Sequence, residues 1–164
     1  MSGGNLQILH LTVNGQKQEV RVDVRTSLLT LLREHLGLLA AKRGCEEGEC
    51  GACAVLVDGR SVQSCLVLAV EMNGHEITTA EALGQPHRLG PVQQAFAETG
   101  ASQCGFCIPG MLIATEALLR ENPNPDAAQV RTALSGNLCR CTGYDRIVKG
   151  VLKAAELRRG GKRS

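Results

Sequence analysis

The sequence predicts an α+β fold in which a strand-rich unit is followed by an all-helical unit. Three observations support this. Residues 9–24 alternate apolar and polar side chains around the turn dipeptide Asn14-Gly15, which is the pattern of a β-hairpin. Residues 91–159 instead repeat their apolar side chains at helical spacing, with prolines at expected helix starts. The eight cysteines fall into two groups, one in each part.

The N-terminal unit continues with a helix and further strands. A helix is expected over residues 26–36, because leucines recur there at every fourth position and a glycine follows. A second hairpin is predicted around Asp58-Gly59, which would join residues 54–57 to residues 61–70. Residues 76–79 are expected to form a last short strand.

The C-terminal unit is predicted to hold four helices. They are opened by Pro91, by Pro109, by the Asn124-Pro125 pair and by Tyr144, and the last is expected to run to about Arg159. Glycine, proline and histidine interrupt both patterns at 84–90. The expected domains are therefore residues 1–83 and residues 84–164.

Composition and charge narrow the class of protein. A net charge of +2 gives no sign of a nucleic-acid or membrane surface, and no run of 18 apolar residues exists to span a bilayer. Residues 1–11 lack a basic region followed by an apolar run, and also a twin-arginine pair, so no export signal is expected. A cytoplasmic location follows. In that reducing compartment, clustered cysteines indicate metal ligands rather than disulfides.

The first cysteine set has the spacing C-x4-C-x2-C-x11-C, and its members are Cys45, Cys50, Cys53 and Cys65. The first three match the spacing of plant-type [2Fe–2S] proteins, in which one loop wraps the cluster. Glycines interleave with the ligands and would let the loop turn its amides toward the sulfurs. A structural zinc site is the alternative, but zinc sites usually pair two C-x2-C knuckles. The fourth ligand is expected on the second arm of the second hairpin.

The second set has the spacing C-x2-C-x31-C-x1-C and is formed by Cys104, Cys107, Cys139 and Cys141. Alone this is less specific, since a C-x2-C pair also occurs in zinc sites and thioredoxin-like dithiols. Each pair precedes an expected helix, whose N-terminus favours thiolate over thiol. The closely spaced C-x1-C pair favours a [2Fe–2S] cluster over zinc without excluding zinc.

Three segments together resemble a known family, the iron–sulfur (small) subunit or N-terminal domain of the xanthine oxidase family of molybdenum hydroxylases. They are C-E-E-G-E-C-G-A-C (45–53), Q-C-G-F-C-I-P-G-M (103–111) and S-G-N-L-C-R-C-T-G-Y (135–144). The resemblance extends from about residue 6 to residue 157. It implies a β-grasp, plant-type ferredoxin-like domain followed by an all-α four-helix bundle domain, each holding one [2Fe–2S] cluster.

The resemblance also implies a function and partners. Electrons would pass from a molybdenum–pterin (molybdopterin) centre on a large subunit through the helical-domain cluster and then the ferredoxin-like cluster to FAD on a medium subunit. The assembly would be a dimer of heterotrimers. By the same resemblance, Gln103 would hydrogen-bond the pterin and Cys141 would lie closest to it. This chain itself would carry no catalytic residue and no substrate site.

Other functions and roles stay open at this point. A free-standing two-cluster ferredoxin would serve unrelated partners, and a zinc-stabilised binding module would have no redox activity. The substrate of the holoenzyme is not readable from this chain. The four histidines show no metal-ligand spacing. Tyr144 is expected to pack against helices rather than to offer its hydroxyl at the cofactor side.

Overall fold

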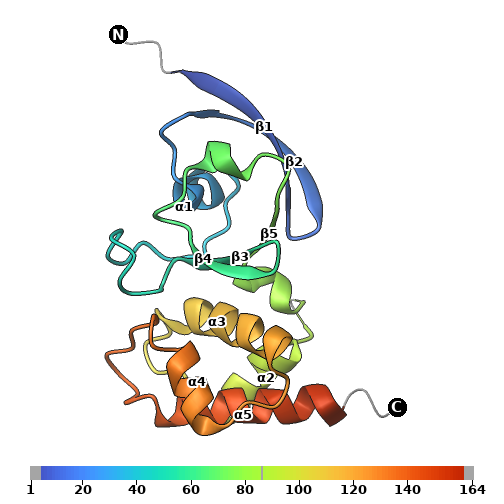
Figure 1. Cartoon of the computed structure of the whole chain (residues 1–164), viewed down its shortest axis with the longest axis vertical. Coiled ribbons are helices and arrows are strands. Elements are labelled where there is room, and N and C mark those ends of the chain that lie inside the picture. The colour runs from blue at the N-terminus through green and yellow to red at the C-terminus, as the bar shows by residue number, and fades with distance from the viewer. Residues whose placement is uncertain (1–4, 86, 161–164) are drawn as a thin grey trace.

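A mixed five-stranded sheet and a set of helices form the two stacked parts of the computed structural model, which describes residues 5–85 and 87–160 (Figure 1). The strand order is β2-β1-β5-β3-β4. β1 pairs in parallel with β5, and the other neighbours are antiparallel. The strands are β1 (Leu6–Val13), β2 (Gln16–Asp23), β3 (Ala54–Val57), β4 (Arg60–Gln63) and β5 (Glu76–Thr78).

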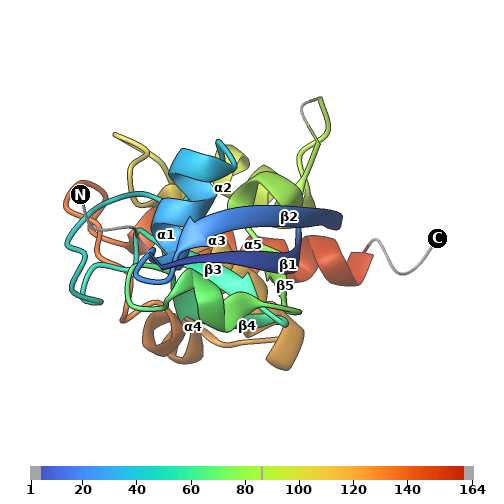
Figure 2. The same ribbon diagram turned by 90° about the horizontal axis from the view of Figure 1, so that it is seen from above.

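The first hairpin is confirmed. Val13 pairs with Gln16 across a two-residue turn, and both turn residues, Asn14 and Gly15, have positive φ angles of 52° and 76°. Asparagine and glycine tolerate this left-handed conformation, which matches the twist of the two strands. The hairpin lies over the rest of the N-terminal part when the molecule is seen from above (Figure 2).

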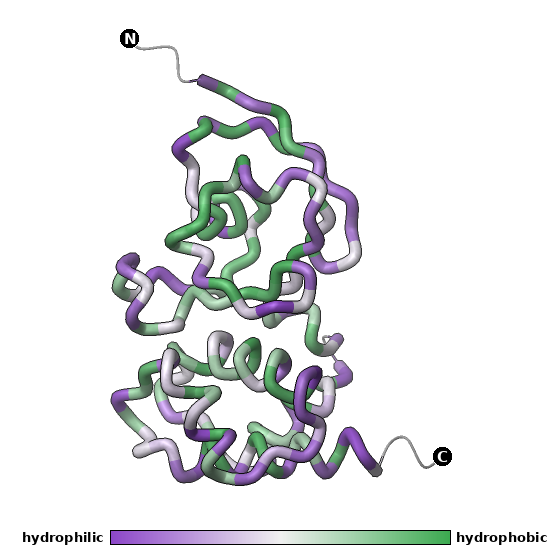
Figure 3. Tube along the Cα trace, viewed as in Figure 1, coloured by the Kyte–Doolittle hydropathy of each residue, from purple (hydrophilic) through white to green (hydrophobic). Residues whose placement is uncertain are grey.

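The helix predicted over residues 26–36 is present but shorter. It begins as α1 (Leu28–Thr30), capped by the Ser27 hydroxyl, and continues as a wider π-helical turn over Leu31–His35. Its leucines are fully buried on more than one face, because the sheet and the following loops surround it. Figure 3 shows this helix as a strongly hydrophobic segment of the N-terminal part.

The second hairpin forms at Asp58-Gly59, but its second arm is shorter than predicted. β4 ends at Gln63, not at Val70. There the Ser64 hydroxyl donates to the Cys53 carbonyl at 2.7 Å, and the Val67 carbonyl accepts the Leu28 N–H at 2.8 Å. These bonds draw the chain out of the sheet. Cys65 therefore lies in a turn after β4, and its expected position on a strand is wrong.

The helices of the second part follow the predicted order. They are α2 (Pro91–Glu98), α3 (Ile108–Glu121), α4 (Ala127–Ala133) and α5 (Asp145–Gly160). One detail differs: α4 is capped by Asp126, whose carboxylate accepts the Gln129 N–H at 2.8 Å, rather than by the Asn124-Pro125 pair. Within the described residues, no helix is both long and apolar enough to cross a membrane.

Strand β3 contributes side chains to the cores of both parts. Its Val55 and Val57 belong to the apolar core beneath the sheet, while Ala54 and Leu56 belong to the core of the helical part. The alternation of side chains along a strand makes this possible, because successive residues point to opposite faces. Because β3 takes part in both apolar cores, the sheet and the helices are held in a fixed arrangement.

Truncation of a buried side chain in β3 should destabilise the whole chain. Leu56→Ala removes a side chain that is 0% exposed, and such truncations cost about 2–5 kcal/mol. We expect a clearly lower melting temperature by calorimetry, whereas Ile8→Ala, at a position 54% exposed on β1, should change it little. Equal effects of the two variants would contradict this role of β3.

Candidate metal centres

The four cysteines of the first set converge at the end of the loop before β3. The loop closes through the Lys42 N–H, which donates to the Ala52 carbonyl at 2.9 Å. The Cys45 Sγ accepts backbone N–H groups of Glu47 and Cys50, each at 3.4 Å. The remaining two members of the set are brought together from either end of the β3–β4 hairpin: the Cys53 and Cys65 Sγ atoms lie 3.3 Å apart.

Positive φ angles and one surface ion pair occur in this loop. Gly48 and Gly51 have φ angles of 83° and 69°, as expected from the interleaved glycines. Glu46 also takes a positive φ, of 57°, and its carboxylate lies 2.7 Å from the Arg43 guanidinium. The acidic residues of the loop, Glu46, Glu47 and Glu49, are all exposed.

The second set converges where α3 and α5 begin. Cys107 directly precedes α3, and Cys141 lies four residues before the start of α5. The Cys104 and Cys141 Sγ atoms lie 3.5 Å apart. The Cys107 and Cys139 thiols form a second close pair, and the Cys139 Sγ also lies 3.1 Å from the Thr142 hydroxyl. The expected placement of both pairs ahead of helices is confirmed.

In both sets the thiols lie in close pairs. All eight cysteines are free, and the Sγ separations of 3.3 and 3.5 Å exceed the ~2.05 Å of a disulfide bond. Among residues 5–85 and 87–160, no three His, Cys, Asp or Glu side chains are spaced to share a single metal ion. Two adjacent thiol pairs suit a two-iron unit, in which each iron takes two cysteines, better than one tetrahedral zinc ion.

Burial and hydrogen bonding set the thiol pKa values apart. Burial raises the pKa of Cys107 to about 12 and that of Cys53 to about 11. The N–H groups of Glu47 and then Cys50 lower the pKa of Cys45 to about 7. A bound cation would be needed to hold the buried thiols as thiolates.

Tyr144 organises the second cysteine loop. Its hydroxyl accepts the Cys139 N–H at 2.9 Å and donates to the Asn137 carbonyl at 3.1 Å. The ring also packs against the helical core, as predicted. The hydroxyl contacts were missed from the sequence, although a tyrosine three residues after Cys141, directly before a helix, was the available signal.

One edge of the second set reaches the surface. Gln103, Cys104 and Cys141 are exposed, whereas Cys107 is buried beneath them. Phe106 is 47% exposed at the same loop, and Arg140 is exposed. This edge is therefore accessible to a group held by another chain.

The two cysteine loops also lie side by side. Figure 1 and Figure 2 place the loop before β3 and the segments before α3 and α5 on the same side of the molecule. The Leu138 N–H donates to the Cys50 carbonyl at 2.9 Å. This hydrogen bond joins the residue before Cys139 to a member of the first set.

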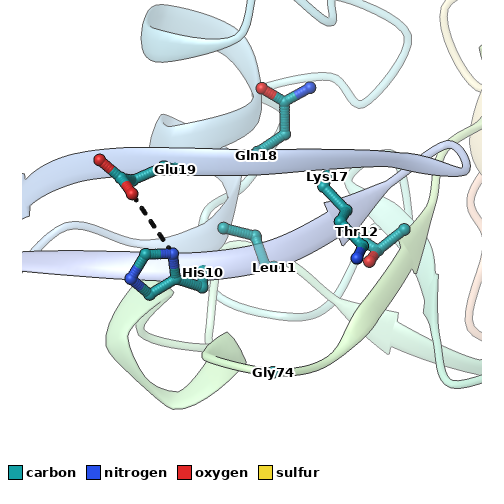
Figure 4. Close-up of a pocket in the computed structure, with 7 residues that line it drawn as sticks. All are labelled: His10, Leu11, Thr12, Lys17, Gln18, Glu19 and Gly74. Atoms are coloured by element: carbon teal, nitrogen blue, oxygen red, sulfur yellow. Dashed lines mark ion pairs between the residues drawn. The ribbon is translucent and has the colours of Figure 1, made fainter.

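A hollow elsewhere on the surface has no part in these centres. It lies against β1 and β2, where the His10 Nδ1 and Glu19 Oε2 atoms are 3.6 Å apart (Figure 4). Both side chains are 69% exposed. No cysteine lines this hollow.

Comparisons with known proteins agree with the geometry. Residues 11–83 match the family model of a 2Fe–2S iron–sulfur cluster binding domain, and residues 79–152 match that of a [2Fe–2S] binding domain. The chain is 50% identical over 147 residues to the xanthine dehydrogenase iron–sulfur-binding subunit of Escherichia coli O157:H7, covering 88% of this chain and 91% of that one.

Two further relatives show the same likeness along nearly the whole chain. The nicotinate dehydrogenase small FeS subunit of Eubacterium barkeri is 43% identical over 148 residues, covering 90% of this chain and 94% of its own. A chain in the crystal structure of quinoline 2-oxidoreductase from Pseudomonas putida 86 superposes with a TM-score of 0.91 at 44% identity, covering 96% of this chain and 99% of that one. The fold is thus a ferredoxin-like domain followed by a helical domain.

Removal of the tyrosine hydroxyl should loosen the second cysteine loop. Tyr144→Phe deletes a group that serves both Cys139 and Asn137, and a lost hydrogen bond of this kind costs about 1–3 kcal/mol. We expect faster hydrogen exchange at the Cys139 amide by mass spectrometry of the intact complex. Thr132→Val, which removes an exposed hydroxyl bonded only to the Ala128 carbonyl of its own helix, should leave that exchange unchanged. Unchanged protection in both variants would show that the hydroxyl does not hold the loop.

Proposed function

Because this chain belongs to the iron–sulfur subunits of the molybdenum hydroxylases, we propose that it carries electrons from a molybdenum–pterin centre through two [2Fe–2S] clusters to FAD. The chain is a subunit of an oxidoreductase complex. The observation that carries the proposal is the pairwise gathering of two sets of four thiols on loops that touch each other.

The proposed ligands of the two clusters are all eight cysteines. The first cluster would be held by Cys45, Cys50, Cys53 and Cys65, and the second by Cys104, Cys107, Cys139 and Cys141. A bound [2Fe–2S] cluster accepts and gives up single electrons, and its potential responds to hydrogen bonds at its sulfurs. The N–H groups of Glu47 and Cys50 already point at the Cys45 sulfur, and they would stabilise added negative charge there.

The exposed edge of the second set is the proposed contact with the molybdenum cofactor. Gln103 and Cys141 are the residues assigned to the pterin, and both lie at that edge. The molybdopterin would sit on a large subunit and the FAD on a medium subunit, in a dimer of heterotrimers. Leu66, 60% exposed beside the first cysteine loop, would lie on the side from which electrons leave.

The finer architecture follows the same assignment. We propose that residues 1–83 form a β-grasp domain and residues 84–164 a four-helix bundle domain. Packing of α2 on α5 and of α3 on α4 supports the bundle, and the helix enclosed by the mixed sheet supports the β-grasp. A cytoplasmic location accords with eight free thiols.

Purification of the tagged chain from its host tests the function as a whole. We expect a large chain with bound molybdopterin and a second chain with bound FAD to co-purify with the tagged chain. The purified complex should be coloured, because iron–sulfur clusters absorb visible light. Recovery of the chain alone and colourless, with zinc in place of iron, would exclude the function.

Single ligand replacements should remove one cluster each. Cys65→Ala should abolish the EPR signal of the first cluster in the dithionite-reduced complex and lower its iron content by about half, because four thiolates are needed per cluster. Cys141→Ala should remove the other signal, so that each variant serves as the control for the other. Loss of the same signal in both variants would contradict two separate centres.

A further inference from the structure

Asn137 connects the two cysteine loops through its side chain. It is only 6% exposed, and its Nδ2 donates to the Gly51 carbonyl at 3.1 Å, across 86 positions of the sequence. The next residue, Leu138, donates its N–H to the Cys50 carbonyl. Two consecutive residues before Cys139 thus hold two consecutive residues of the first loop.

This contact is made possible by glycines on both sides. A Cβ atom on Gly51 would lie 2.3 Å from the Gly136 carbonyl oxygen and 2.4 Å from the Asn137 Nδ2. A Cβ atom on Gly110, in the first turn of α3, would lie 2.2 Å from the Gly51 carbonyl oxygen. Side chains at these positions would force the loops apart, so the close approach is built into the backbone.

The bond from Asn137 serves the connection between loops rather than either loop alone. The Gly51 carbonyl already accepts the Ala54 N–H at 3.1 Å, which closes its own turn. On the other side, the Asn137 carbonyl accepts the Tyr144 hydroxyl, which also binds the Cys139 N–H. Asn137 is therefore anchored to the second cysteine loop through its backbone and to the first through its amide.

We propose that Asn137 is a positioning residue that fixes the separation and orientation of the two iron–sulfur centres. The inference rests on the proposed function, because it concerns the transfer of one electron from the second cysteine set to the first. No bond forms or breaks in that step, so its rate depends on how closely the two centres are held. The hydrogen bond between Leu138 and Cys50 directly links the two sets, and the amide of Asn137 stabilises it from the adjacent position.

The test is Asn137→Leu in the intact complex, since leucine has a similar branched shape but no donor. Asn122→Leu is the matched control, because its Nδ2 donates to the Gln129 Oε1 at 3.0 Å beyond the far end of α3. Asn137→Ala is the second variant. It removes the same donor but, unlike leucine, places no methyl groups where the amide was. Iron and sulfide content shows whether both centres are loaded, and low-temperature EPR of the fully reduced complex measures the magnetic interaction between them.

We expect both Asn137 variants to keep two reducible centres but to lose or change the splitting that arises from their interaction. Electron transfer between the centres, followed by freeze-quench EPR, should be slower. The Asn122 control should match the wild type. Unchanged splitting and rate in fully loaded Asn137 variants would overturn the proposal, as would failure of both variants to bind iron. A wild-type complex without two iron–sulfur signals would instead refute the proposed function itself.

Discussion

The convergence of four thiols at each of two places is the constraint on which the rest of the structure depends. Sulfur ligands must be brought from separate elements into a small volume, and burial raises the pKa of the innermost ones. A bound cation is what makes such a thiolate cluster favourable. The regular elements end where this requirement begins: β4 stops before Cys65, and α3 starts directly after Cys107.

Packing and hydrogen bonds hold the two cysteine sets in one arrangement. β3 contributes one face to each apolar core, so the sheet and the helices cannot move independently without exposing buried side chains. The loop before β3 and the second cysteine loop are joined by the Leu138–Cys50 and Asn137–Gly51 hydrogen bonds. For the transfer of electrons between two centres, a fixed distance between them serves the function directly.

Much of the fold could be predicted from the sequence, because local signals agree with the final structure. The Asn14-Gly15 turn and the helices opened by Pro91 and Pro109 follow from backbone preferences that act over a few residues. One error arose where a distant contact decides: the second arm of the second hairpin ends early because the Val67 carbonyl accepts the Leu28 N–H at the start of α1. The other error was local, because the side chain that caps α4 belongs to Asp126 and not to the Asn124-Pro125 pair.

The candidate site divides in the same way. Cysteine spacing identified both sets, but it could not say which thiols lie side by side or that the loops meet. Those facts depend on contacts such as Asn137 with Gly51, which no local pattern reveals. X-ray absorption at the iron and zinc edges of the intact complex tests the central claim most directly. Iron surrounded by sulfur, with a second iron as neighbour, is the predicted result; zinc, or iron without an iron neighbour, would contradict it.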